Sequence, residues 1–172
     1  INIINTSNTL WFEATAPASF GWYTVFEGTS NQTISGNITF LDSIIINNAA
    51  GVSTAYNFDV KSGFQSINPL LKLKTGLLNT TGSGIVRILL TGTNTIVGHS
   101  TNSYINGKLR RNITGTGSYD FPVGTASNYE LANITLTSVT GVSNITAEFL
   151  TANLGNIPTT LTEASYSYDN LL

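Results

Sequence analysis

Short apolar runs separated by turn-forming residues extend along the whole chain, and this pattern predicts an all-β protein. The runs are rich in Ile, Val, Leu, Thr and aromatic residues, and Gly, Asn, Ser or Thr stands between them, as is typical of strands joined by turns. Only residues 147–154 offer a competing helical period. The expected strands lie at residues 10–13, 22–26, 37–41, 43–47, 55–60, 70–74, 85–90, 95–98, 103–105, 108–111, 118–121, 129–137, 144–150 and 165–168. Such spacing indicates a sandwich, a barrel or a solenoid.

Two hairpins are predicted in the C-terminal half. Asn106-Gly107, between two short apolar runs, is a dipeptide that tolerates the two positive φ angles of a type I′ turn. A second hairpin joins residues 129–137 to residues 144–150 through Thr140-Gly141, and both of its strands alternate apolar and polar residues. Apolar faces that meet across a strand pair favour a half-buried antiparallel sheet. The C-terminal half is therefore predicted to be an antiparallel β-sandwich, either Ig-like or jelly-roll-like.

The middle of the chain has a different pattern. At residues 44–46, 70–71 and 85–90 the apolar residues run together instead of alternating, which is typical of strands buried on both faces or of solenoid rungs. No strict repeat period accompanies these runs. The N-terminal half therefore either completes the sandwich or forms β-solenoid-like rungs. We expect a single all-β domain over residues 1–172, with a soft division between 1–100 and 101–172.

The surface is expected to be polar but almost uncharged. Charged residues make up 9% of the chain, against about 25% in a typical soluble domain. Asn, Thr, Ser and Gly supply 79 of the 172 residues instead. A net charge of −2 creates no field that would attract nucleic acid or an anionic membrane. No apolar run reaches the roughly 20 residues that a membrane-spanning helix needs.

Residues for catalysis or metal binding are scarce. The chain has no Cys and a single histidine, His99, so it cannot build a zinc cage. A Ser–His–Asp triad would depend on geometry that the sequence does not show, and no G-x-S-x-G motif is present. The nine carboxylates are scattered and form no calcium loop. We expect neither a cofactor nor a metal, and we expect that the protein is not an enzyme; a hydrolase is the last of the alternatives.

The densest charge in the sequence is a basic cluster. Lys108, Arg110 and Arg111 stand within four positions. They either contact an acidic glycan or a neighbouring subunit, or they are solvated charges that keep an edge strand from unwanted pairing. The second interpretation is favoured, because exposed charges contribute little to binding.

Aromatic residues crowd the first 26 positions. Exposed Trp11, Trp22 and Tyr23 would form a platform on which sugar rings stack. Buried, the same side chains would form the core of the first sheet, which is the favoured interpretation because aromatic residues dominate large buried areas.

One part of the sequence resembles a known family. The segments SYINGKLRR at 103–111 and GTGSYDFPVG at 115–124, followed by Tyr129, resemble a recurrent module of large secreted surface proteins exported by the type IX secretion system. The match covers about residues 103–149, and residues 70–84 resemble the strand-and-glycine rungs found upstream of it. The resemblance implies an adhesin segment, stalk or spacer and brings no catalytic residues.

Together these features predict an extracellular, cell-surface structural or adhesive protein of bacterial type, with a filament subunit as one form. Self-association through strand edges, or through donation of the segment Ile1–Leu10 to a neighbour, is the expected partnership. The alternative is a carbohydrate-binding module of a secreted protein, which would bind surface glycans.

Overall fold

The structure is a computed structural model, and it describes residues 2–4, 23–40, 43–61, 70–89 and 92–150. The described part consists of β-strands and one short 3₁₀ turn, Thr93–Thr95. The predicted all-β class is therefore confirmed. The expected strands at 10–13 and 165–168 lie outside the described residues.

The strands form three sheets, which we call A, B and C. Sheet A contains β1 (Asn2–Ile4), β2 (Tyr23–Gly28), β5 (Ser43–Asn48), β8 (Leu71–Thr75) and β11 (Ile96–Val97). Sheet B contains β3 (Gln32–Ile34), β6 (Val52–Thr54), β9 (Leu78–Thr80), β12 (Ile105–Asn106), β14 (Gly117–Gly124) and β15 (Tyr129–Leu136). Sheet C contains β4 (Ile38–Phe40), β7 (Phe58–Val60), β10 (Val86–Ile88), β13 (Leu109–Asn112) and β16 (Asn144–Ala147).

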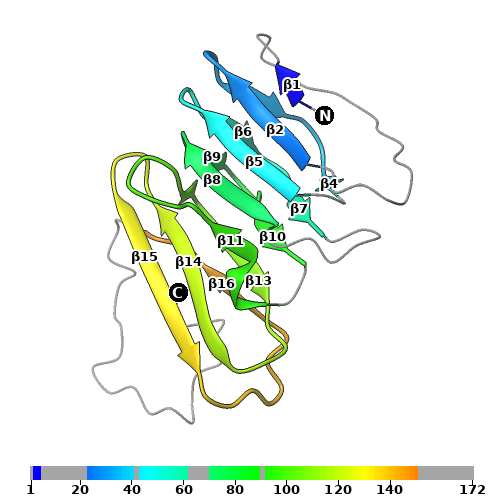
Figure 1. Cartoon of the computed structure of the whole chain (residues 1–172), viewed down its shortest axis with the longest axis vertical. Coiled ribbons are helices and arrows are strands. Elements are labelled where there is room, and N and C mark those ends of the chain that lie inside the picture. Colours follow the sequence, from blue (N-terminus) through cyan, green and yellow to red (C-terminus); the bar gives the residue numbers. More distant parts are fainter. Residues whose placement is uncertain (1, 5–22, 41–42, 62–69, 90–91, 151–172) are drawn as a thin grey trace.

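From β2 to β13 the chain visits sheets A, B and C in turn, which makes the fold a β-solenoid. Rungs 1 to 4 are β2–β3–β4, β5–β6–β7, β8–β9–β10 and β11–β12–β13. Each strand pairs in parallel with its equivalent in the next rung, as β2 with β5 and β5 with β8. Figure 1 shows the rungs stacked along the molecule, with β1 at one end and β15 at the other.

Apolar side chains at equivalent positions stack inside the solenoid. In sheet A, Phe26 pairs with Ile46 and Ile46 with Leu73, and all three side chains are fully buried. The ring of Phe26 also contacts Phe40 and Phe58 of sheet C, with centroids 5.9 and 6.2 Å apart. Because each strand presents only two or three residues to this interior, the core is built from columns that run along the stack rather than from two facing sheets.

The corners between sheets A and B depend on buried polar contacts. The side chain of Asn48 is fully buried: its Nδ2 donates to the carbonyl of Ser30 (2.9 Å) and to Oε1 of Gln32 (3.2 Å), and its Oδ1 accepts from the N–H of Ala50 (3.0 Å). In the next rung Gly76 has a φ of +82°, and a Cβ there would lie 1.7 Å from the carbonyl oxygen of Asn48. Only glycine fits this close approach.

The prediction of a hairpin at Asn106-Gly107 is wrong. The strands on either side of it, β12 and β13, lie in sheets B and C. β12 pairs in parallel with β9 and β14, and β13 pairs with β10 and β16. Gly107, with a φ of +128°, turns the corner between two sheets instead of folding a strand back on its neighbour.

The second predicted hairpin, and with it the purely antiparallel sandwich, is also wrong. β15 pairs with β14, and β16 pairs with β13. These two antiparallel pairs lie at one end of the solenoid, where they extend sheets B and C beyond rung 4. Of the two alternatives left open for the N-terminal half, the structure has the solenoid rungs, and these continue through rung 4 across residue 100. The predicted apolar face of β16 is correct, since Ile145 and Ala147 are buried.

Candidate functional site

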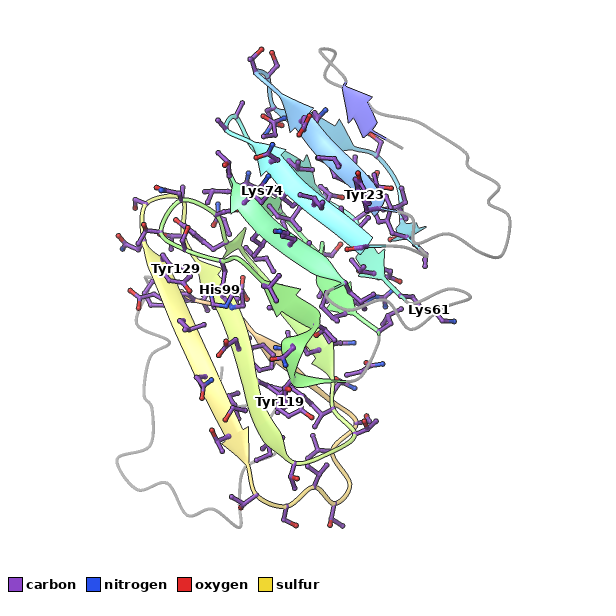
Figure 2. All side chains as sticks on the ribbon, viewed as in Figure 1. Tyr23, Lys61, Lys74, His99, Tyr119 and Tyr129 are labelled. Carbon is purple, nitrogen blue, oxygen red and sulfur yellow. The ribbon has the colours of Figure 1, made fainter. Side chains whose placement is uncertain are left out.

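A cluster of polar and aromatic side chains lies where rung 4 meets the antiparallel strands. His99 follows β11, Asp120 is on β14, and Tyr129 begins β15. Nδ1 of His99 lies 2.8 Å from the hydroxyl of Tyr129, and its Nε2 lies 3.5 Å from Oδ2 of Asp120. Nδ2 of Asn133 donates to Oδ1 of Asp120 at 2.6 Å. Figure 2 shows His99 and Tyr129 side by side.

Two tyrosines connect this cluster to the sheet B corner. The rings of Tyr104 and Tyr129 have centroids 5.3 Å apart, and the hydroxyl of Tyr104 donates to the carbonyl of Thr125 at 2.6 Å. Burial raises the pKa of Tyr104. Burial also raises the pKa of Tyr129, and the carboxylate of Asp120 adds to that increase. Both phenols are therefore protonated, and able to donate, at neutral pH.

The cluster joins a histidine to an acid but not to a serine. The two ring nitrogens of His99 face Tyr129 and Asp120, so neither nitrogen is available to accept a proton from a serine nucleophile. The nearby hydroxyls are engaged elsewhere: that of Ser100 accepts from the N–H of Asn102, and that of Ser103 donates to the carbonyl of Gly76. The arrangement holds the β14–β15 pair against rung 4 and does not have the geometry of a triad.

Strand alternation divides the basic cluster predicted from the sequence. Arg110 points outward from β13, and its Nε donates to Oγ1 of Thr146 at 3.0 Å. Lys108, at the corner before β13, is partly exposed. Arg111 points inward and is 1% exposed. Of the three predicted contact residues, Lys108 and Arg110 are the ones that a partner could reach.

The guanidinium of Arg111 is held by oxygen atoms of the interior. Its Nη1 donates to the carbonyl of Asp120 (2.6 Å), and its Nη2 donates to the carbonyls of Gly92 and Thr93 and to the hydroxyl of Thr95 (each 2.8 Å). It also lies over the rings of Tyr119 and Phe121, 5.3 and 5.7 Å from their centroids. Desolvation lowers the pKa of Arg111 to about 10, so the group remains charged at neutral pH.

An ion pair that the sequence did not reveal lies on the outer face of sheet C. Nε and Nη2 of Arg87 donate to the two carboxylate oxygens of Asp59 at 2.6 and 2.5 Å. The hydrogen bond to Asp59 raises the pKa of Arg87. The partners are 28 residues apart in sequence, so only the solenoid register brings them together. The sequence indicates this ion pair only once it is known which residues lie at equivalent positions in adjacent rungs.

The outer face of sheet B carries a row of uncharged polar side chains, which we call the polar ladder. Register pairs Thr33 with Ser53, Ser53 with Asn79, and Asn79 with Asn106. Nδ2 of Asn106 donates to Oδ1 of Asn79 at 2.9 Å, and Nδ2 of Asn31 donates to Oγ of Ser53 at 3.0 Å. Sequence analysis missed the ladder because it missed β3, β6 and β9, which supply three of its four residues.

The N-terminal aromatic platform is described only in part. Trp11 and Trp22 lie outside the described residues. Tyr23, at the start of β2 (Figure 2), is 49% exposed. Phe26 on the same strand is fully buried in the core.

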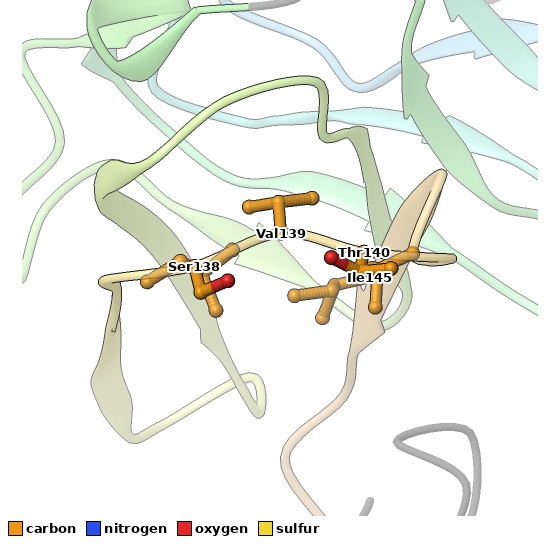
Figure 3. A pocket seen from close by; sticks show the side chains of 6 residues that line it. Ser138, Val139, Thr140 and Ile145 are labelled. Carbon is orange, nitrogen blue, oxygen red and sulfur yellow. The ribbon is translucent and has the colours of Figure 1, made fainter.

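A small pocket lies beside the loop between β15 and β16 (Figure 3). Its volume is about 90 Å³, and its lining includes Val139, Thr140 and Ile145. Binding sites for drug-sized ligands are several times larger, about 300–1,000 Å³. Among the residues that the structure describes, no three His, Asp or Glu side chains gather in a way that could hold a metal ion, and no helix is long and apolar enough to cross a membrane.

No family model, curated protein or solved structure matches this chain.

Proposed function

We propose that this chain is an extracellular structural or adhesive module of a bacterial surface protein, and that it does not act as an enzyme. The observation that carries the proposal is the solenoid itself. Stacked apolar columns fill its interior, and each rung adds one strand to the outer face of each sheet. Solenoids of this type offer extended binding surfaces that grow with the number of repeats. The resemblance of residues 103–149 to modules of the type IX secretion system agrees with this role.

The side chains of the His99 cluster support the same role. Hydrogen bonds join His99 to Tyr129 and Asn133 to Asp120, and the ring of His99 lies 3.5 Å from the carboxylate of Asp120, so these contacts link rung 4 to β14 and β15. This pattern suits a fastening between parts of a scaffold, since both ring nitrogens of His99 already have partners. The polar, nearly uncharged outer surface keeps such a scaffold hydrated.

Self-association remains part of the proposal, and the sheet ends are where it would occur. β15 and β16 are the last strands of sheets B and C at one end of the described fold. A long last strand is a template for pairing with another chain. At the other end β1 pairs with β2 of its own chain, so donation of residues 1–10 to a neighbour would require β1 to leave that place.

An adhesion assay tests the proposal. Beads coated with the chain should adhere to bacterial surface material and to insoluble polysaccharide more strongly than albumin-coated beads, and light scattering at rising protein concentration should reveal association. Beads that adhere to no surface, together with a strictly monomeric chain, would contradict it. Turnover of a glycoside or ester substrate that is lost in His99→Ala would indicate a hydrolase instead.

A further inference from the structure

We infer that the outer face of sheet B binds an extended, uncharged polysaccharide along the polar ladder of Thr33, Ser53, Asn79 and Asn106. The inference rests on the adhesive function proposed above and names the surface and the ligand class through which adhesion would occur.

The first argument is the repeat of the ladder. Its four residues occupy equivalent positions on adjacent parallel strands, which are spaced about 4.7–4.9 Å apart. This spacing is comparable with the length of one pyranose unit in an extended glycan chain. A linear polymer lying across the strands can therefore contact several rungs at once, and each further contact is intramolecular and adds avidity.

The second argument is that the ladder is organised before any ligand arrives. Asn106 donates to Asn79, and Asn31 donates to Ser53, while Nδ2 of Asn79 also reaches the carbonyl of Val52 at 3.4 Å. A carboxamide has two donor hydrogens and a carbonyl oxygen with two lone pairs. These contacts fix the amide groups and leave hydrogen-bonding capacity for hydroxyl groups of a ligand. Fixed polar groups lose less entropy on binding.

The third argument is the close packing of the ladder at Gly51, at the corner where β6 begins. Gly51 is buried, and a Cβ there would lie 3.1 Å from Nδ2 of Asn79, 3.1 Å from the carbonyl oxygen of Leu77 and 3.4 Å from Nδ2 of Asn31. Because the corner has no side chain, the amides of Asn31 and Asn79 can lie close to its backbone. This close packing is a second feature that holds the ladder amides in place before a ligand binds.

The fourth argument is charge, which selects an uncharged ligand. The strands β3, β6, β9 and β12 have the sequences QTI, VST, LNT and IN, without a charged residue. Basic side chains lie on the outer faces of the other two sheets, such as Lys72 on sheet A and Arg110 on sheet C, whereas β14 of sheet B carries the partly exposed carboxylate of Asp120. An anionic polymer would be attracted to those faces rather than to sheet B.

An exposed aromatic residue, Tyr56, is close in sequence to the ladder residue Ser53. Tyr56 follows β6 at the corner between sheets B and C and is 47% exposed. Its N–H donates to Oγ1 of Thr54 at 3.0 Å, which fixes the backbone of this corner. An exposed tyrosine ring offers an apolar face on which a sugar ring can stack.

Two lysine substitutions and a matched control test the inference. Thr33 and Thr39 are both exposed central residues of three-residue strands in rung 1, on sheets B and C. The double variant Thr33→Lys/Ser53→Lys should reduce co-sedimentation with cellulose, xylan or mannan by about tenfold or more, since several hydrogen bonds are lost together. Thr39→Lys should bind as the parent does. Circular dichroism and thermal melting verify that both variants fold.

The outcomes separate this inference from the proposed function. Retention of the parent on at least one neutral glycan, loss in the double variant and retention in Thr39→Lys support the inference. Equal retention of all three proteins, binding to pectate alone, or binding to no glycan overturns it. In those cases bead adhesion by the parent would still uphold the adhesive function, whereas loss of bead adhesion by the parent itself would overturn that function too.

Discussion

At the scale of single residues, the most informative side chain is one that a sequence reader assigns to the surface. Arg111 stands next to Arg110 and one position before Asn112, the last residue of β13, yet it is buried against the rings of Tyr119 and Phe121. Its guanidinium bridges three backbone carbonyls from the start of rung 4 and from β14. The guanidinium thus donates several hydrogen bonds at the end of the solenoid, where parallel pairing between rungs gives way to antiparallel pairing.

Replacing Arg111 should destabilise the protein. Arg111→Met keeps apolar bulk but leaves the carbonyls of Gly92, Thr93 and Asp120 without their donor, so we expect a loss of about 3 kcal/mol in the free energy of unfolding. Urea denaturation followed by circular dichroism measures it. Arg110→Met, on the outer face, is the matched control and should cost less than about 1 kcal/mol. A variant at 111 as stable as the parent would show that relief of desolvation offsets the lost bonds.

The buried tyrosines should make stability sensitive to alkaline pH. The pKa values of Tyr104 and Tyr129 are raised in the folded state. Their stabilising contribution is therefore complete below the unfolded pKa of about 10 and is lost as the pH rises through the raised folded values. The urea midpoint should therefore fall as the pH rises above about 10.

Tyr104→Phe isolates one part of this pH dependence. It removes the hydrogen bond to Thr125 and should lower stability at neutral pH by about 1 kcal/mol, while flattening the decline above pH 10. Tyr56→Phe, at an exposed corner, should retain the slope of the parent. An unchanged slope in Tyr104→Phe would contradict the assignment.

At the scale of elements, most strands of sheets A and C could be predicted from the sequence, whereas β3, β6 and β9 of sheet B could not. The strands of sheet A contain apolar runs such as residues 44–46, which mark them clearly. β3, β6 and β9 are three residues long and carry an outward Thr, Ser or Asn at their centre. So short a segment shows no periodicity of its own, and its polar residues look like those of a turn. The polar ladder could not be predicted for the same reason, because its residues are neighbours only when the rungs are stacked.

The hairpin predictions failed for a related reason. Asn-Gly and Thr-Gly dipeptides indicate a change of direction but not the angle of the turn. In this chain Gly107 turns the backbone from one sheet to the next. The strand pairing is decided by buried apolar columns that bring together residues far apart in sequence, such as Phe26 with Ile46 and Phe58 with Val86. Apolar alternation still identified the buried side of β16 correctly, since burial of a face does not depend on which strand lies beside it.

The corner at Gly76 gives a sharp test of these turns. Gly76→Ala places a methyl group against the backbone of Asn48, whereas Gly36→Ala meets nothing within 4 Å. Both positions have a positive φ, +82° and +89°, so the strain of that conformation, about 1–2 kcal/mol, is shared. Gly76→Ala should therefore lose more than Gly36→Ala in the free energy of unfolding, measured by urea denaturation. Equal losses would show that the corner can shift to accommodate the methyl group.

At the scale of the whole molecule, stability should vary along the stack. In solenoids each repeat contacts mainly its neighbours, so inner repeats have two stabilising interfaces and outer ones have one. Rungs 2 and 3, whose columns include Ile46, Leu73 and Leu78, have neighbours on both sides. The antiparallel strands at the far end depend on fewer contacts of this kind.

Hydrogen exchange should resolve this gradient. Amides of β5, β8 and β9 should exchange slowest, and those of β15 and β16 fastest among the described strands, because local opening costs least at the ends. Mass spectrometry of deuterated peptides provides the measurement. Uniform protection from β2 to β16 would instead indicate a single cooperative unit.

The number of residues per rung differs along the chain, and this has a consequence for where insertions can be tolerated. Paired positions are 20 residues apart between Glu27 and Asn47 but 28 apart between Asp59 and Arg87, and the stacked columns tolerate both spacings. Connections can therefore lengthen without altering the buried columns, since closing a longer loop costs little extra entropy. New peptide segments, including epitopes placed there by protein engineers, can accordingly be accommodated at the corners while the interior keeps its order.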